Sequence, residues 1–154
     1  MDRSGFELPL LLGAAFRGIV DKLHVELEKY GHSEARPIHG FALQAIGPDG
    51  ATISELGRRL GVSKQAAAKT AAGLEQLGYV TRRPSHDDAR AAVLVWSARG
   101  EEMLGLSAQI FEQLRQGWVR QLGIERVRAI EDDLQALVDY TGGAKIGNLP
   151  GWLR

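Results

Sequence analysis

The chain of 154 residues contains no cysteine. This excludes disulfide bonds, thiolate metal ligands, a cysteine nucleophile and regulation through an oxidised thiol. No run approaches the ~20 apolar residues that a bilayer-spanning helix needs. The most apolar early run, Leu8 to Phe16, is short and lies between Glu7 and Arg17. Because the first ten residues include acidic ones and no convincing small-residue cleavage site is present, we expect no signal peptide. With no membrane span either, we expect a cytoplasmic protein.

Net charge is also absent, since 19 basic residues balance 19 acidic ones. The distribution is uneven, however. Residues 51–97 carry seven Lys or Arg against four Asp or Glu, whereas residues 98–141 carry five against eight. A basic middle favours contact with nucleic acid, although charge alone fits a solvated surface equally well. The hydrophobic content of 44% and the charged content of 25% are ordinary for a folded globular protein.

Apolar periodicity and helix-ending glycines predict helices on both sides of this basic middle. Ser4 and Glu7 have capping-box spacing, so we expect the first helix to begin near Pro9 and to run to about Tyr30. The other predicted helices are a short one from Ile38 to Ile46, a long one after Ser97, and a last one between Gly123 and Gly142. The final residues, 144–154, have no helical or strand pattern and predict an irregular tail.

The basic middle has the pattern of a helix-turn-helix. Thr52 and Glu55 have capping-box spacing, with Ser54 as a competing cap for the same short helix. Gly61 ends that helix, and Ser63 caps another that runs to about Leu77. Two short helices joined by a tight turn with glycine are typical of a helix-turn-helix, whose second helix enters the DNA major groove.

The second helix separates into two sides at 100° per residue. Ala67, Thr70, Ala71, Leu74 and Leu77 fall on one side, and Gln65, Ala68, Lys69 and Ala72 on the other. Gln65, Ala68 and Lys69 suit base edges, and Ser63 and Lys64 suit phosphates. The alternative is an ordinary surface helix rich in alanine, a strong helix former.

Two β-prone runs follow, Tyr79 to Arg83 and Ala91 to Trp96, with a polar segment between them that predicts a hairpin. A hairpin after a recognition helix is a wing. Arg90 at its tip and Arg82 and Arg83 on its first strand suit the DNA backbone or minor groove. Asp88 is placed to orient Arg90 by a charge-assisted hydrogen bond; the alternative is a loop ion pair that faces water.

Four segments in register resemble the multiple-antibiotic-resistance regulator (MarR) family. They are the run ISELGRRLGVS from Ile53 to Ser63, the run LEQLGYVTR from Leu74 to Arg82, the wing-tip triplet Asp88-Ala89-Arg90, and the helix start Ser97-Ala98-Arg99-Gly100. The resemblance extends from about Leu8 to Thr141, since helix number and order agree. Departures from the family pattern are Gly57, where alanine is common, and the small residues Ala72 and Gly73, which replace longer polar ones.

The resemblance implies a mainly α fold with a small β-hairpin wing, that is, a winged helix-turn-helix between N- and C-terminal dimerisation helices. Residues 1–46 and 98–143 would form the dimerisation region and residues 47–97 the DNA-binding region. It further implies a homodimer that binds a pseudopalindromic operator in double-stranded DNA, and repression relieved by a small aromatic or phenolic ligand.

Other sites are weaker predictions. Arg17, His39 and Trp118 could line a ligand pocket, with core packing and solvated charge as the alternative. The four histidines lack metal-ligand spacing, no nucleophile elbow or phosphate-binding glycine loop occurs, and we expect no metal, no cofactor and no enzyme activity. The competing hypothesis is a winged-helix module that binds another protein instead of DNA.

Overall fold

The computed structural model describes residues 4–87 and 91–142. In chain order, its elements are α1 (Glu7–Lys29), α2 (Pro37–Ile46), α3 (Ile53–Leu60), α4 (Lys64–Gln76), β1 (Val80–Pro84), β2 (Ala92–Trp96), α5 (Ala98–Leu122) and α6 (Ile124–Tyr140). This confirms the predicted fold class and order: four helices, a hairpin and two helices, with boundaries within about two residues of those predicted.

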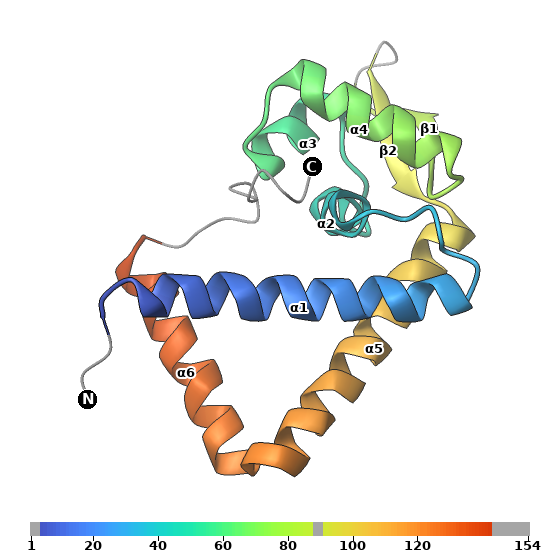
Figure 1. The fold of residues 1–154 in the computed structure, drawn as a ribbon. Helices are drawn as coiled ribbons and strands as arrows, with labels where there is room; N and C mark the ends of the chain where they lie inside the picture. The colour runs from blue at the N-terminus through green and yellow to red at the C-terminus, as the bar shows by residue number, and fades with distance from the viewer. Residues whose placement is uncertain (1–3, 88–90, 143–154) are drawn as a thin grey trace.

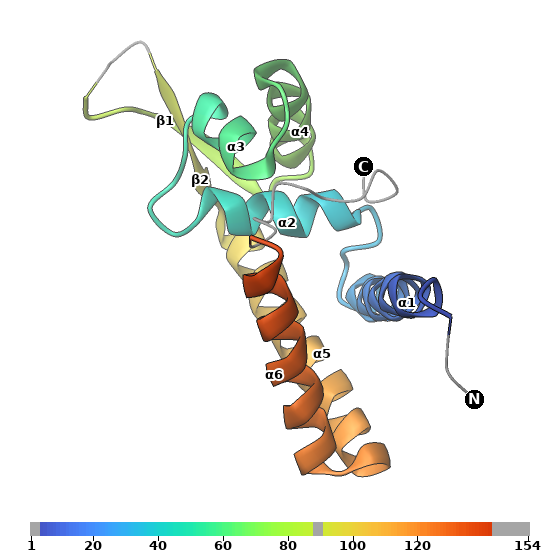
Figure 2. The same cartoon turned by 90° about the vertical axis from the view of Figure 1, so that its left-hand side faces the viewer.

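The elements divide into two groups on either side of α1 (Figure 1). The shorter helices α2, α3 and α4 lie on one side together with the hairpin, while α5 and α6 form a V on the other. Helix α2 packs against α3, α4 and β2 and also against α5, so it joins the two groups. Figure 2 shows α1 nearly end-on, standing to one side of the plane of α5 and α6.

The predicted Ser4–Glu7 capping box is wrong. Helix α1 begins at Glu7 with Phe6 at the N-cap position, and no side chain caps it. The backbone carbonyl of Ser4 accepts the hydrogen bond from Glu7 N at 2.9 Å, while the Ser4 hydroxyl faces Phe6 N instead. A turn of backbone therefore satisfies the donor that the capping box would have satisfied.

The core lies mainly where α2 meets the winged region. Leu43 and Ile46 of α2, Leu56 of α3, Leu74 of α4 and Leu94 of β2 are all fully or almost fully buried and form one cluster. The predicted inner side of α4 agrees in large part, because Ala67, Ala71 and Leu74 are buried while Thr70 and Leu77 are half-buried. This packing fixes which side of α4 remains outside.

None of the helices within the described ranges combines the length and the apolar character that crossing a membrane requires.

Candidate nucleic-acid interface

The turn between α3 and α4 is set by two glycines. Gly61 adopts left-handed backbone angles (φ 65°, ψ 33°), which glycine enters without a steric penalty. Gly57 lies inside α3, and a Cβ there would lie 3.2 Å from the Val62 carbonyl oxygen. The glycine that departs from the usual alanine therefore gives the turn room to pack against α3.

Both predicted helix caps of this unit are present. The hydroxyl of Thr52 accepts from Glu55 N at 3.2 Å, and the Glu55 carboxylate accepts from Thr52 N at 2.8 Å. The capping box is thus confirmed, and Ser54, the competing cap, lies inside α3. At the next helix the Ser63 hydroxyl accepts from Ala66 N at 3.1 Å and keeps its own proton free to donate.

The outer side of α4 is polar near its N-terminus. Lys64, Gln65 and Lys69 are exposed, as is Ala72, and Ala68 is half-buried. The segment from Ser63 to Lys69 therefore presents two cations, one amide and one hydroxyl on its outer side, with small methyl groups between them. This surface has the chemistry of a groove-reading helix.

On the wing, Arg82 and Arg83 are both exposed on β1, which pairs antiparallel with β2 in the register Arg82 to Leu94 and Arg83 to Val93. Arg82 does not point freely to solvent. Its Nη2 and Nε atoms lie 2.7 and 2.8 Å from Oε1 of Glu75 on α4. The other predicted wing residues, Asp88 and Arg90, lie outside the described residues.

Arg59 plays a role that the sequence did not indicate. Its Nη1 donates to the carbonyl oxygens of Ala45 and Ile46, at 2.8 and 3.0 Å. These carbonyls end α2 and have no partner within that helix. Arg59 therefore has a structural role, because it fixes α2 to α3.

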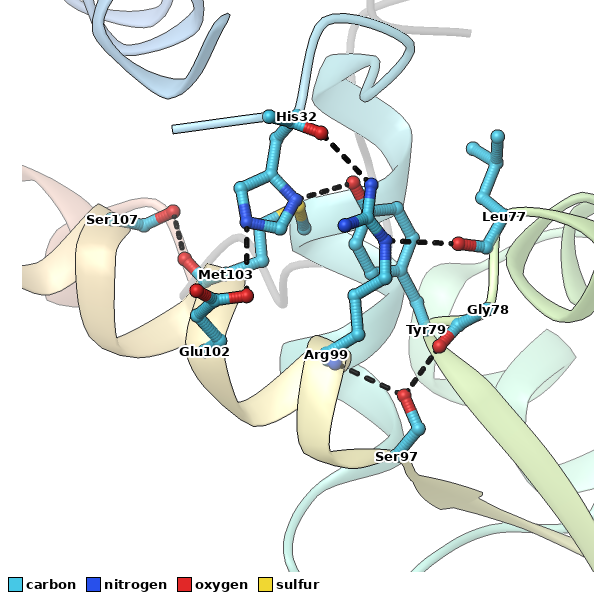
Figure 3. Close-up of polar contacts among 11 residues, drawn as sticks. His32, Leu77, Gly78, Tyr79, Ser97, Arg99, Glu102, Met103 and Ser107 are labelled. Atoms are coloured by element: carbon cyan, nitrogen blue, oxygen red, sulfur yellow. Dashed lines mark hydrogen bonds and ion pairs between the residues drawn. The ribbon is translucent and has the colours of Figure 1, made fainter. Parts of the chain in front are cut away.

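A second residue that the sequence analysis missed is Arg99, in the first turn of α5 (Figure 3). Its Nε donates to the Leu77 carbonyl at 3.1 Å and its Nη2 to the Gly31 carbonyl at 2.9 Å. The guanidinium also lies over the Tyr79 ring, 5.1 Å from the centroid. Arg99 thus joins the end of α4, the α1–α2 connection and α5 at one point.

His32 lies beneath this contact and is only 1% exposed. Its Nδ1 is 2.8 Å from the Tyr79 hydroxyl, and its Nε2 is 3.6 Å from a Glu102 carboxylate oxygen (Figure 3). Burial lowers the pKa of His32, Arg99 lowers it further, and Glu102 acts in the opposite direction. The ring is therefore held in its neutral form.

The structure does not bring the three predicted pocket residues together. Arg17 is exposed on α1 within 3.9 Å of Asp21, and Trp118 is 36% exposed on the second half of α5. His39 is buried beside Tyr79, with ring centroids 6.4 Å apart. Only His39 of the three lines an open cleft of about 780 Å³, which lies between α2 and α4. Within the described ranges no cluster of three His, Asp or Glu side chains is placed to hold a metal.

These features define a winged helix-turn-helix, and a comparison with known families gives one match to part of the chain. Residues 37–91, which extend from α2 through the first strand of the wing, match the model of the MarR family. This confirms the resemblance over the matched residues, which contain three of the four sequence segments. A comparison with curated proteins gave no match.

Solved structures of MarR-type regulators share the fold over most of the chain. The transcriptional regulator Tm0710 of Thermotoga maritima is 26% identical, with a TM-score of 0.63 over 88% of this chain and 94% of its own. A crystal structure of MarR is 24% identical, with a TM-score of 0.72 over 92% and 94%. The MepR–DNA complex of Staphylococcus aureus is 17% identical, with a TM-score of 0.66 over 90% and 99%. The chain thus has the architecture of proteins that include one solved on DNA.

Proposed function

We propose that this protein is a dimeric, sequence-specific DNA-binding transcription regulator of the MarR type, a repressor released by a small ligand. The observation that carries the proposal is the exposed N-terminal segment of α4, where Ser63, Lys64, Gln65 and Lys69 stand clear of the core beside a wing with an exposed Arg83. In this assignment residues 47–97 read DNA, with Asp88 and Arg90 at the wing tip, and the remaining helices join two subunits.

The proposed dimer is supported by apolar side chains that are exposed to solvent in the single chain. On α1 and the residue before it they are Phe6, Leu8, Leu10, Leu11 and Leu12, and on α6 they are Ile130, Leu134, Leu137, Val138 and Tyr140, all between 38% and 89% exposed. An apolar surface of this extent, on two elements distant from the recognition helix, is typical of a subunit interface. A symmetric dimer would present two recognition helices about 34 Å apart, in successive major grooves.

The alternative function is a winged-helix module that binds another protein. The cations at Lys64, Lys69 and Arg83 argue against it, because a protein partner gives no reason to keep exposed positive charge on both the recognition helix and the wing. Salt dependence separates the two functions, since each phosphate contact contributes about one unit to the slope of log K against log salt.

The test begins with purified full-length protein and fragmented genomic DNA from the source organism. Bound fragments are selected at two salt concentrations and sequenced. We expect a short inverted repeat, recovered more efficiently at the lower salt concentration. Recovery of no fragment above background by correctly folded protein would contradict DNA binding and favour the protein-interaction module.

Lys69→Ala tests the assigned surface. We expect it to weaken binding to the selected repeat by about 1–3 kcal/mol if Lys69 contacts a base, with relaxed preference at one position, and to reduce the salt slope by about one if it contacts phosphate. Arg128→Ala on α6, an exposed arginine remote from the winged region and on the opposite side of the helix from Ile130 and Leu137, is the matched control and should leave affinity unchanged. Equal affinities of the two variants measured by fluorescence anisotropy would remove Lys69 from the interface.

A further inference from the structure

The polar junction in Figure 3 links the end of α4 to the start of α5. Helix α4 packs against α2, α3 and β1, and α5 packs against α1, α2, α6 and β2, but within the described residues α4 and α5 share no extensive packing surface. Their direct connection therefore depends on contacts at their ends. The Ser97 hydroxyl supplies one by donating to the Gly78 carbonyl, and the Arg99 guanidinium supplies another by donating to the Leu77 carbonyl.

The position of Arg99 runs against the preference of its own helix. Arg99 is the second residue of α5, where the positive end of the helix dipole disfavours a cation. Its two acceptors are the carbonyls of Leu77 and Gly31, at or just beyond the C-terminal ends of α4 and α1, where a cation is favoured. A local cost combined with a gain at two other helices indicates that this arginine serves the junction and not α5.

The guanidinium also fixes the relative orientation of the segments that it contacts. Nε and Nη2 donate in fixed directions to two carbonyls, at 3.1 and 2.9 Å, and the guanidinium lies 5.1 Å from the centroid of the Tyr79 ring. Because this donor fork is planar and rigid, the carbonyls of Leu77 and Gly31 are held in one arrangement. The compact ammonium of a lysine has no such fork.

Arg99 is nevertheless exposed to solvent, in contrast to the Tyr79 ring beneath it, which is 1% exposed. Water competes for the hydrogen bonds of an exposed side chain, so these contacts contribute little to the free energy of unfolding. The buried cluster that includes Leu56, Leu74 and Leu94 holds the winged region together without Arg99. Loss of the guanidinium should therefore leave the chain folded and release the orientation of α4 relative to α5.

We propose that Arg99 is a positioning residue for DNA binding, which fixes the direction of α4 without contacting DNA itself. This role rests on the proposed DNA-binding function and its dimer. An α4 that is free to reorient must be ordered when DNA binds, and that ordering weakens binding. It also relaxes selectivity, because two rigidly held recognition helices fit one separation of half-sites whereas two loosely held ones fit several.

Label distances test the orientation of α4 without DNA. The chain has no cysteine, so Ala72→Cys and Gln109→Cys, at exposed positions on α4 and α5, accept one spin label each. Labelled full-length protein is diluted with unlabelled protein, and pulsed electron paramagnetic resonance gives the distance distribution within one chain. We expect Arg99→Met to broaden that distribution and Arg99→Lys to broaden it less. Arg128→Met on α6 is the charge control and should leave the width unchanged. Equal widths with Arg99 and with Arg99→Met would overturn the positioning role.

Half-site spacing tests the consequence for DNA. The selected inverted repeat is compared with a derivative that has one base pair inserted at its centre, which moves one half-site by about 3.4 Å and rotates it by about 34°. We expect Arg99→Met to weaken binding to the native repeat about tenfold, the order expected for loss of one charged hydrogen bond, and to reduce the penalty of the insertion by a similar factor. Arg128→Met should retain the wild-type penalty.

The ratio of the two affinities separates positioning from other roles of Arg99. A direct phosphate contact, or a smaller fraction of folded protein, would weaken binding to both DNAs equally and leave the ratio unchanged, so an unchanged ratio would overturn the positioning role. If the wild type binds DNA and only this ratio fails to change, the proposed function stands. A wild type that binds no DNA would overturn the proposed function and the role of Arg99 in it, while the label distances still decide whether Arg99 directs α4.

Discussion

His32 shows how one buried side chain makes the stability of the whole chain depend on pH. Burial lowers its pKa below the ordinary value of 6.5, and the same holds for His24 and His39. As pH falls through 6.5 the unfolded chain takes up protons that the folded chain refuses, so the free energy of unfolding decreases. The loss continues until the pH falls below the pKa values of the folded state.

We therefore expect the urea midpoint of unfolding to decrease between pH 7.5 and pH 5.5, and to decrease less steeply in His32→Phe, which keeps an aromatic ring stacked near Tyr79. Tyr79→Phe is the control, since it removes the hydrogen bond but leaves His32 to titrate, and it should lower stability while retaining the slope. Circular dichroism at matched ionic strength measures both. Identical slopes for wild type and His32→Phe would show that His32 does not contribute.

The outward residues of α4 were predictable because helical periodicity alone assigns Gln65 and Lys69 to the side opposite Ala67 and Leu74. The roles of Arg59 and Arg99 were not. Both donate to backbone carbonyls that are 13 to 68 residues away in sequence. No periodicity records such a contact, because its acceptors are groups that every residue has.

Among the elements, α5 contains three glycines, and two of them, Gly100 and Gly105, have opposite consequences for the fold. A Cβ at Gly100 would lie only 2.2 Å from the carbonyl oxygen of Tyr79, whereas nothing lies within 4 Å of a Cβ at Gly105. We expect Gly100→Ala to destabilise the protein by about 2–4 kcal/mol through forced separation of α5 from β1, because small-to-large changes in tight contacts cost this order. Gly105→Ala should stabilise it by up to about 1 kcal/mol through helix propensity.

Chemical denaturation of the two alanine variants measures this difference under identical conditions. Equal stabilities would contradict the close approach of the first turn of α5 to the start of the wing.

The ion pair between Glu75 on α4 and Arg82 on β1 links the recognition helix to the wing. Because both side chains are about one-third exposed, the pair itself contributes little to stability. Its larger effect is on charge, since Glu75 neutralises a cation beside the proposed DNA-facing surface. We expect Glu75→Gln to tighten DNA binding a few-fold and to steepen its salt dependence by about one unit as Arg82 becomes available.

Glu101→Gln, an exposed glutamate in the first turn of α5, is the control for the loss of one negative charge. Fluorescence anisotropy over a range of salt concentrations gives both quantities. Weaker binding by Glu75→Gln would mean that the pair is needed to position the wing.

Element order was predictable because caps, glycine stops and apolar periodicity agreed at Thr52, Gly61, Ser63 and Ser97. The way α1 begins was not predictable in this way. Ser4 has capping-box spacing to Glu7, but the backbone carbonyl of Ser4, and not its side chain, accepts the hydrogen bond from Glu7 N. Capping-box spacing states which residues could pair. The competing backbone turn is decided by local dihedral angles that the spacing does not record.

At the scale of the whole molecule, the exposed apolar stripe of α6 is part of the proposed dimer interface. We expect Leu134→Glu to shift the protein from dimer to monomer and to weaken DNA binding sharply, because a charge would be buried at the interface. Ala136→Glu places the same charge on the opposite side of α6 and should leave the dimer intact.

Sedimentation velocity over a range of protein concentrations measures the assembly state of both variants. A wild-type protein that is monomeric at all concentrations would contradict the dimer, and an unchanged dimer in Leu134→Glu would place the interface elsewhere.

The first turn of α5 is fastened to the end of the recognition helix by Arg99, by the Ser97 hydroxyl, which donates to Gly78 O, and by the contact of Gly100 with Tyr79. Helix α5 then extends for 25 residues away from that junction. A small rotation of this long helix therefore produces a larger displacement at its end. With a rise of 1.5 Å per residue, a tilt of one degree about the far end of α5 moves the junction by roughly 0.7 Å. In a two-subunit assembly joined through α1 and α6, as proposed, a few degrees of such tilt would shift the two α4 helices relative to the DNA helical repeat.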